Sequence, residues 1–347
     1  MLLFQRKKLY SVQFRVETER KEYTKMKQYD VVALGELLID FTQNGKSDQG
    51  NAMFEANPGG APCNVLAMLN NLGKKTSFIG KVGNDQFGIM LKDTLVELGI
   101  GTENLLLDEG VHTTLALVHT LADGDRDFSF YRNPGADMML KAEEVSEKLI
   151  TDAKVFHFGT LSMTHAEVRE ATKKALCIAK NAGAMISFDP NLREPLWDSL
   201  DTAKEQVLYG LQYADILKIS DNEIQWFTGE EDYTEGVKKI RQIKDIPLIL
   251  VSMGKEGSRA YYKGMIVEVP PFLQENTIET TGAGDTFCAS VINYVLEHGL
   301  EDLKENQLKE MLVFANGAAS LITTKKGALR VMPKKEEVEK LILERNM

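Results

Sequence analysis

Several absences narrow what this chain can be. The sequence has three cysteines, none with Cys-x-x-Cys spacing, and five histidines without metal-ligand spacing. No disulfide framework or histidine metal centre is therefore expected, and this use of cysteine is typical of a reducing, cytoplasmic compartment. No apolar run approaches the length that spans a membrane, so a membrane partner is not expected.

Two familiar nucleotide-binding motifs are also missing. Gly45-Lys46-Ser47 resembles the end of a P-loop, but the first glycine of that motif would have to stand at Asp40. Gly282-Ala283-Gly284 would begin a dinucleotide fingerprint, but its third glycine would have to stand at Phe287. A nucleotide site in this chain must be built in another way.

The net charge argues against a protein that binds nucleic acids or anionic membranes nonspecifically. The chain has 347 residues, is 43% hydrophobic and has a formal net charge of −10. It can bury a large core, as one α/β domain or two smaller ones. The negative charge argues against nonspecific binding to nucleic acids or anionic membranes. Any polyphosphate must be held locally, by backbone amides, a few cations and a metal ion.

Residues 1–26 differ from the rest of the chain. They contain seven Lys and Arg against three Glu, and only short apolar clusters. A signal peptide needs a continuous apolar segment, and the glutamates argue against a transit peptide. We expect residues 1–26 to be an upstream-start extension or a disordered arm, and residues 27–347 to form one domain.

From Tyr29 onward, apolar strands alternate with helical patterns, which predicts an α/β fold. Strands are expected at 29–35, continuing to 41, and at 76–82, 154–158, 185–189, 216–219 and 247–251. Two segments, 113–121 and 126–132, instead predict a hairpin across Asp123-Gly124. An antiparallel insertion in an enzyme with a parallel sheet suggests a lid.

Polar residues follow several of these strands, where open α/β sheets bind ligands. Asp40 follows the first strand, and Gly59-Gly60 precedes a helix in which Asn64 could bond a polyol hydroxyl. Arg132 ends the hairpin, and Arg193 lies in a polar cluster after a later strand. From these stretches alone, Asp40 could be a turn acid, Asn64 a satisfied core amide and Arg132 an exposed edge residue.

Two stretches nearer the carboxyl end could bind a nucleotide. Ser220 and Glu223 have capping-box spacing at the start of a helix, which by itself is a good structural explanation. The glycine loop from Ser252 to Gly257 could hold a nucleotide or only turn the chain. Asn316 lies within a helix expected at 308–323.

The stretch from Glu279 to Phe287 carries the most chemistry. Two glycines around Ala283 let backbone N–H groups converge at the start of a helix, which makes an anion site. Asp285 would repel phosphate there but could act as a general base beside one. The alternative is a glycine loop that caps a helix, with Asp285 complementing the helix dipole. The combination suggests phosphoryl transfer to a hydroxyl group.

Two motifs, Gly59-Gly60 with Asn64 and Thr281 to Phe287, resemble in order and separation those of the ribokinase-like (PfkB) carbohydrate kinases. The resemblance extends from about Lys27 to the carboxyl end, and segments 35–41, 130–134 and 189–193 resemble fructokinases in particular. It implies a three-layer α/β fold, with a central, mostly parallel β-sheet flanked by helices. It also implies a small β-sheet lid, built from segments near 36–56 and 112–133.

The resemblance further implies an activity. ATP, with Mg²⁺, would phosphorylate the primary hydroxyl of a sugar, and D-fructose would give fructose 6-phosphate and ADP. A homodimer that contacts through the lids is implied as well. Two alternatives stay open: a kinase of the same fold for 2-keto-3-deoxygluconate, ribose or a nucleoside, and a non-catalytic sugar- or nucleotide-binding regulator. The retained Asp285 and glycine turn argue against the regulator.

Residue by residue, the resemblance makes Asp285 the base and the amides of Gly282, Ala283 and Gly284 the anion hole. The matched sugar positions are Asp40, Gly59, Gly60 and Asn64, with Arg132 and Arg193 as further sugar or phosphate contacts. The matched nucleotide positions are Ser220, Glu223, Ser252, Gly254, Gly257, Gly284 and Asn316. Glu223 would hold Mg²⁺ through water. Glu279 and Thr281 match a K⁺ site, although the family usually has Asp in place of Glu279.

Overall fold

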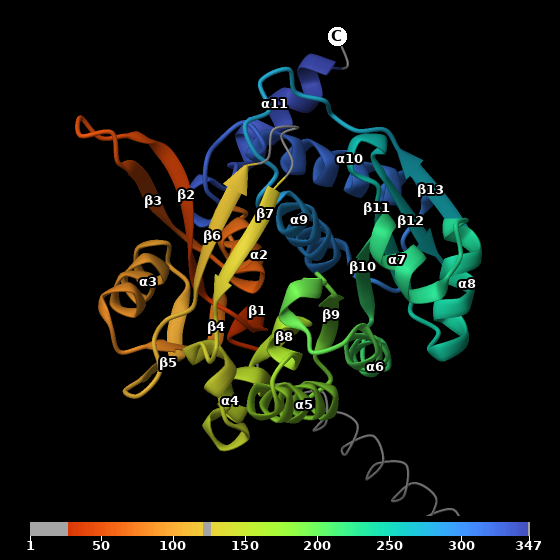
Figure 1. Ribbon diagram of the computed structural model, residues 1–347. Coiled ribbons are helices and arrows are strands. Elements are labelled where there is room, and N and C mark those ends of the chain that lie inside the picture. Colours follow the sequence, from red (N-terminus) through yellow and green to blue (C-terminus); the bar gives the residue numbers. More distant parts are fainter. Residues whose placement is uncertain (1–26, 121–125, 346–347) are drawn as a thin grey trace, which may run out of the picture.

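The first strand, β1 (Tyr29–Leu34), lies inside a nine-stranded sheet with the order β13-β12-β11-β10-β9-β8-β1-β4-β5 (Figure 1). The computed structural model describes residues 27–120 and 126–345. The predicted amino-terminal extension, 1–26, and the predicted hairpin turn lie outside the described residues. The other strands of this sheet are β4 (Thr76–Gly83), β5 (Gly101–Asp108), β8 (Ala153–Gly159), β9 (Met185–Asp189), β10 (Ile216–Ser220), β11 (Leu248–Ser252), β12 (Ser258–Tyr262) and β13 (Met265–Val269).

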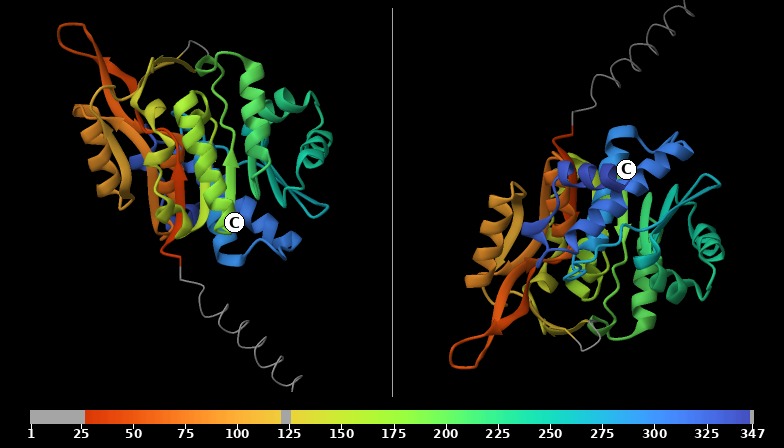
Figure 2. Two further views of the ribbon diagram at one scale, coloured as in Figure 1. Left: turned by 90° about the horizontal axis from the view of Figure 1, so that it is seen from below. Right: turned by 90° about the horizontal axis from the view of Figure 1, so that it is seen from above.

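The neighbouring strands β11, β10, β9, β8, β1, β4 and β5 run parallel, and β12 and β13 continue the sheet antiparallel. Side chains alternate across β1: Val32 and Leu34 pack into one core, and Val31 and Ala33 into another. This period of two, with both faces buried, is the reason the strand is apolar throughout. Helices therefore cover both faces of the sheet (Figure 2).

One face packs against α2 (Ala61–Asn71), α9 (Ala283–His298) and α10 (Glu305–Ile322), and the other against α5 (Ala166–Asn181) and α6 (Leu200–Leu211). The remaining α-helices are α3 (Gln86–Glu97), α4 (Glu147–Thr151), α7 (Asp221–Thr228), α8 (Tyr233–Ile243) and α11 (Lys335–Arg345). Short 3₁₀ helices occupy Ala136–Met139, Ala142–Glu144, Leu161–Met163, Glu194–Leu196, Gly254–Glu256 and Leu329–Val331. No helix in the described ranges is both long and apolar enough to cross a membrane.

A second, four-stranded sheet has the order β3-β2-β6-β7. It consists of β2 (Leu38–Lys46), β3 (Ala52–Gly59), β6 (Leu115–Thr120) and β7 (Arg126–Tyr131). The predicted antiparallel pairing of 113–121 with 126–132 is confirmed by β6 and β7. The predicted three-layer fold with a smaller sheet is therefore confirmed, whereas the function of that sheet as a lid stays a prediction.

One expectation about the strands was wrong. The first strand does not continue to Phe41: β1 ends at Leu34, and β2 starts at Leu38 in the other sheet. Apolar periodicity could not show this break because both halves are buried. Strand β5 was not predicted, because its first residues include Glu103 and Asn104 and it lies at the edge of the sheet.

Candidate active site

Helix α9 starts at Ala283, one residue after the left-handed Gly282 (φ 77°). Glycine adopts this conformation without steric cost, which explains the abrupt turn. The N–H groups at a helix start have no acceptor within the helix and can face an anion. The amide of Ala283 is already engaged, because it donates to Thr280 O at 3.2 Å. Gly284 and Asp285 then occupy the first turn, and Gly284 lines an open cleft.

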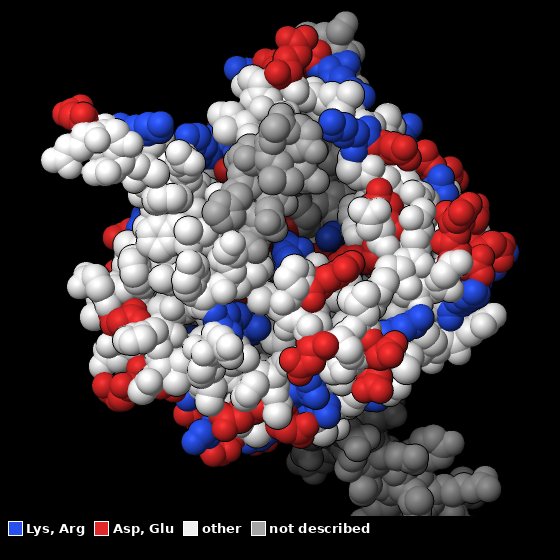
Figure 3. Space-filling view, viewed as in Figure 1, with Lys and Arg blue, Asp and Glu red and all other residues white. Residues whose placement is uncertain are grey.

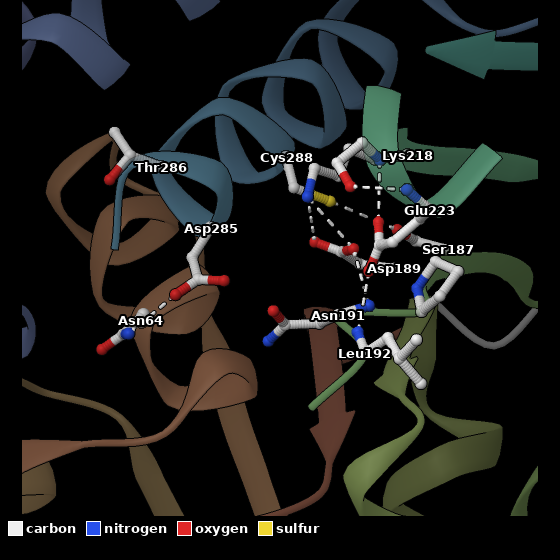
Figure 4. A network of polar contacts seen from close by, with 12 residues as sticks. Asn64, Ser187, Asp189, Asn191, Leu192, Lys218, Glu223, Asp285, Thr286 and Cys288 are labelled. Carbon is white, nitrogen blue, oxygen red and sulfur yellow. Dashed lines mark hydrogen bonds and ion pairs between the residues drawn. The ribbon is translucent and has the colours of Figure 1, made fainter. Parts of the chain in front are cut away.

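Asp285 is joined to the other motif by a direct hydrogen bond. Asn64 Nδ2, on the fourth residue of α2, donates to Asp285 Oδ2 at 2.7 Å, across 221 positions of sequence (Figure 4). Both side chains are buried. Burial raises the pKa of Asp285, while the bond from Asn64 and the charges of Lys218 and Arg193 oppose the rise. The carboxyl is thus oriented, shielded and more basic than an exposed aspartate, as a general base needs to be.

Gly59 and Gly60 both lie in close contact with the segment 36–40, and the contact of Gly60 is with backbone. A Cβ atom on Gly59 would lie 2.3 Å from Asp40 Oδ2, and one on Gly60 would lie 2.4 Å from the carbonyl oxygen of Glu36. Gly60 also has φ 129°, which L residues rarely adopt. The predicted sugar positions Asp40, Gly59, Gly60 and Asn64 therefore lie where the smaller sheet meets the start of α2.

Glu36 is a further buried acid at this junction. Its Oε1 accepts the N–H of Ala61, the first residue of α2, at 2.7 Å. It lines a small recess together with His157, Asp189 and Asn191. Burial raises the pKa of Glu36 to about 7, although its bond to the Ala61 amide lowers it. The sequence showed Glu36 as an acid after an apolar strand, but not its burial.

Replacing Glu36 with glutamine is expected to flatten the dependence of stability on pH. The native pKa of Glu36 is about 7 and the ordinary value is 4.5. Its contribution is therefore fully present below pH 4.5 and is lost as the pH rises to about 7. Each pKa unit corresponds to about 1.4 kcal/mol. Thermal melts of both proteins from pH 4 to pH 8 test this: parallel curves would contradict the assignment.

Five of the seven predicted nucleotide residues line a cleft of about 430 Å³. The predicted residues among its lining are Arg193, Ser220, Glu223, Ser252, Gly254 and Gly284. They come from the ends of β10 and β11, from the loops after β9 and β11, and from the first turns of α7 and α9. The molecule is hollowed near the centre of this face, where acidic and basic side chains lie next to one another (Figure 3). The sequence motifs thus meet at the carboxyl ends of the parallel strands.

Glu223 joins two segments at the edge of this cleft. Its Oε2 accepts the N–H of Ser220 at 2.8 Å, and Ser220 Oγ accepts the N–H of Glu223 at 3.3 Å, which confirms the capping box. Its Oε1 accepts the N–H of Leu192 at 2.7 Å. Each oxygen keeps a second lone pair, with which it could accept a hydrogen bond from a metal-bound water.

Two of the predicted ligand-binding residues, Arg132 and Asn316, make contacts within the protein instead of lining the cleft. Arg132 is buried: its Nη2 lies 2.7 Å from Asp137 Oδ2, and its Nη1 donates to Thr164 Oγ1. It is therefore neither an exposed edge residue nor part of the cleft lining. Asn316 Nδ2 donates to the carbonyl oxygens of Val269 and Pro270 and so fixes the chain after β13.

Glu279 and Gly257 also make structural contacts. Glu279 Oε1 accepts the N–H of Gly327 at 2.8 Å, which ties the segment before α9 to the loop after α10. Gly257 has φ 100°, and a Cβ there would lie 2.2 Å from Val269 O. Gly257 therefore belongs to the turn that closes the loop rather than to the cleft lining.

Sequence reasoning missed Lys218. It lies in the apolar strand β10, is 6% exposed and lines the cleft. Its Nζ lies 3.1 Å from Asp189 Oδ2. Burial raises the pKa of Asp189 to about 7, with Lys218 opposing and the carboxylates of Glu223 and Asp285 adding to the rise. The available signal was a lysine within a short apolar strand.

Comparison with known proteins agrees with this geometry. The model of the pfkB family carbohydrate kinases matches residues 28–335. An Arabidopsis thaliana protein named "Probable fructokinase-2" is 40% identical over 305 residues, which are 87% of this chain and 92% of that protein. A fructokinase from Xylella fastidiosa with bound ATP superposes with a TM-score of 0.83 at 30% identity, covering 92% of this chain and 99% of that one.

A fructokinase variant from Vibrio cholerae, solved with fructose, ADP and potassium ion, superposes with a TM-score of 0.80 at 27% identity. That match covers 90% of this chain and 98% of the other. The family match extends over nearly all the described residues and includes both glycine motifs and Asp285. The chain therefore belongs to the pfkB family of carbohydrate kinases, and it is a sugar kinase.

Proposed function

We propose that this kinase transfers the γ-phosphoryl group of ATP to the primary hydroxyl of D-fructose, giving fructose 6-phosphate and ADP. The observation that carries the proposal is the hydrogen bond from Asn64 to Asp285. It joins the glycine-rich junction that would hold the sugar to the helix start that would hold the phosphate. The choice of fructose is supported by relatives named fructokinases, at 40% and 30% identity.

In the proposed reaction, Asp285 takes the proton of the primary hydroxyl as its oxygen attacks the γ-phosphorus. The new O–P bond forms as the bond to the ADP oxygen breaks, so ADP leaves with the electron pair. The N–H groups at the start of α9 stabilise the charge on the transferred group. Asn64 keeps the carboxyl of Asp285 in place through its amide.

Mg²⁺, when bound, would offset charge on the ATP phosphates, and Glu223 would hold it through water. The two backbone contacts of the Glu223 carboxylate support this indirect role. K⁺ would lie near Glu279 and Thr281, where Glu279 already orders the neighbouring loop through Gly327.

Potassium is expected to raise kcat through Glu279. Replacing K⁺ with Na⁺ at constant ionic strength should lower kcat of the wild type, because the smaller ion orders the same oxygen ligands less well. Glu279→Gln should remove most of this difference, and Glu279→Asp should keep it. Steady-state ADP release measures the effect, and equal wild-type rates in the two salts would exclude a potassium site here.

The substrate is expected to be fructose in a direct comparison. ADP release by purified protein is measured with fructose, ribose, 2-keto-3-deoxygluconate, adenosine and tagatose, each at several concentrations with ATP and Mg²⁺. The highest kcat/KM should be for fructose. A clear preference for another acceptor would overturn the substrate while leaving the kinase. Nucleotide and sugar binding without turnover would instead support the non-catalytic regulator.

The smaller sheet is proposed to act as a lid over the sugar and to form the contact of a homodimer. Met53, Phe54 and Tyr131 on this sheet are 46%, 44% and 63% exposed, which leaves apolar area for a second copy to cover. Light scattering should give twice the chain mass. A monomer at working concentration would refute the dimer.

A further inference from the structure

Lys218 is directed at the start of α9 by the strand that carries it. Side chains alternate along β10: Leu217 and Ile219 pack into the core beneath α5 and α6, whereas Ile216 packs into the core beneath α9 and α10. Lys218 lies two residues after Ile216 and therefore on the same face. Its ammonium points toward α9, and Figure 4 shows it on the other side of Asp285 from Asn64.

The ammonium lies directly against the glycine turn. A Cβ atom on Gly284 would be 3.1 Å from Lys218 Nζ, so the absence of a side chain leaves room for the lysine. Nζ is held by both oxygens of Asp189, at 3.1 and 3.2 Å. A buried ammonium needs such a partner, because burial without one is strongly unfavourable.

This lysine differs from the other buried cations of the described chain. Lys81 pairs with Glu144 and Asp108, and Arg132 pairs with Asp137; neither lines the cleft. Lys218 does line it. Of these three buried cations, Lys218 is the one that a ligand in the cleft could contact.

The carboxylates around the cleft favour a cation at the position of the Lys218 ammonium. Asp189, Glu223 and Asp285 all face Lys218 or one another, and His157 and Cys288 lie close by. A triphosphate adds further negative charge among these carboxylates. The cationic side chains of the cleft lining are Lys218 and the more exposed Arg193.

We propose that Lys218 contacts the oxygens of the transferred phosphoryl group, and that Asp189 positions its ammonium for that contact. The assignment rests on the proposed kinase reaction at this site. Lys218 remains protonated throughout: it donates hydrogen bonds to the non-bridging oxygens, while the hydroxyl proton goes to Asp285 and the leaving electron pair goes to ADP. Lys218 thereby stabilises charge that develops on the phosphoryl group.

The test compares K218M with wild type in turnover and in binding. We expect kcat to fall about tenfold or more, with little change in the KM for sugar. Affinity for a non-hydrolysable ATP analogue should fall more than affinity for ADP, because only the former carries the γ-phosphoryl group. K218R should recover part of both losses. Lys81→Met, which removes a buried lysine that does not line the cleft, should keep wild-type kcat.

The double variant D189N/K218M separates this role from stability. It leaves no unpaired buried carboxylate and serves if K218M fails to fold. Persistent loss of kcat and of analogue affinity in the double variant supports the phosphoryl contact. Recovery of both, or an equal loss of affinity for ADP and the analogue, overturns it. Absence of turnover in the wild type would overturn the proposed function, while the binding comparison would still decide the role of Lys218.

Discussion

Replacing Asp285 with alanine is expected to lower kcat by at least about 100-fold at saturating ATP, Mg²⁺ and fructose, the range of a lost general base. The reason is structural: this is the carboxyl that Asn64 orients at the start of α9, and burial raises its pKa. Steady-state ADP release gives kcat. Turnover equal to that of the wild type would show that Asp285 is not the base.

The thermal stability of a second variant, Asp285→Asn, provides a control for the loss of turnover. A carboxyl with a raised native pKa opposes folding once it is ionised, so Asp285→Asn should keep or raise the melting temperature at pH 7. Loss of turnover without loss of stability identifies a chemical role. Asp201, an exposed aspartate in the first turn of α6, is the matched site, and Asp201→Ala should leave kcat unchanged.

The second large effect is expected at Gly60. Gly60→Ala should lower the free energy of unfolding by about 3 kcal/mol or more. The alanine would have an unfavourable φ, and its Cβ would overlap a backbone atom of Glu36. Its Cβ would lie 2.4 Å from the carbonyl oxygen of Glu36, a backbone atom that cannot rotate away. The start of α2 would have to shift, and Asn64 with it, so kcat should fall too. Urea unfolding followed by circular dichroism measures the loss.

Gly183→Ala is the matched control for Gly60→Ala. Gly183 also has a positive φ, 63°, but nothing lies within 4 Å of the Cβ it would gain. Gly183→Ala should lower the free energy of unfolding by about 1–2 kcal/mol, which is the cost of the positive φ alone, and should keep wild-type kcat. Equal losses for the two variants would show that the contact between Gly60 and Glu36 is unimportant.

The sequence predicted the features that depend on residues close together in the chain. The glycine turn before Asp285, the capping box of Ser220 and Glu223, and the hairpin of β6 and β7 each depend on residues a few positions apart. The alternation of apolar segments was sufficient to predict an α/β fold, and the family resemblance implied its three layers. The resemblance carried by the motif pair predicted that Asn64 and Asp285 belong to one site, and a hydrogen bond joins the two side chains.

What could not be predicted depends on neighbours distant in sequence. In the sequence, Lys218 is an isolated charge within an apolar strand, and nothing nearby explains it. Its partner, Asp189, is brought beside it only by the pairing of β9 with β10. Arg132 and Asn316 have polar groups that suit a ligand, yet the fold engages Arg132 with Asp137 and Asn316 with the chain after β13. No local pattern tells whether a donor is already satisfied by the protein.

The position of β1 has a consequence for how the protein is made. Its neighbour β8 pairs with it in parallel, and the ion pair at that edge, Asp30 with Lys154, joins residues 124 positions apart. At roughly 5–20 residues per second, a ribosome needs about 6–25 seconds to synthesise the intervening chain. For that time one edge of an apolar strand has no partner, and such an unpaired edge is a site where a nascent chain can aggregate.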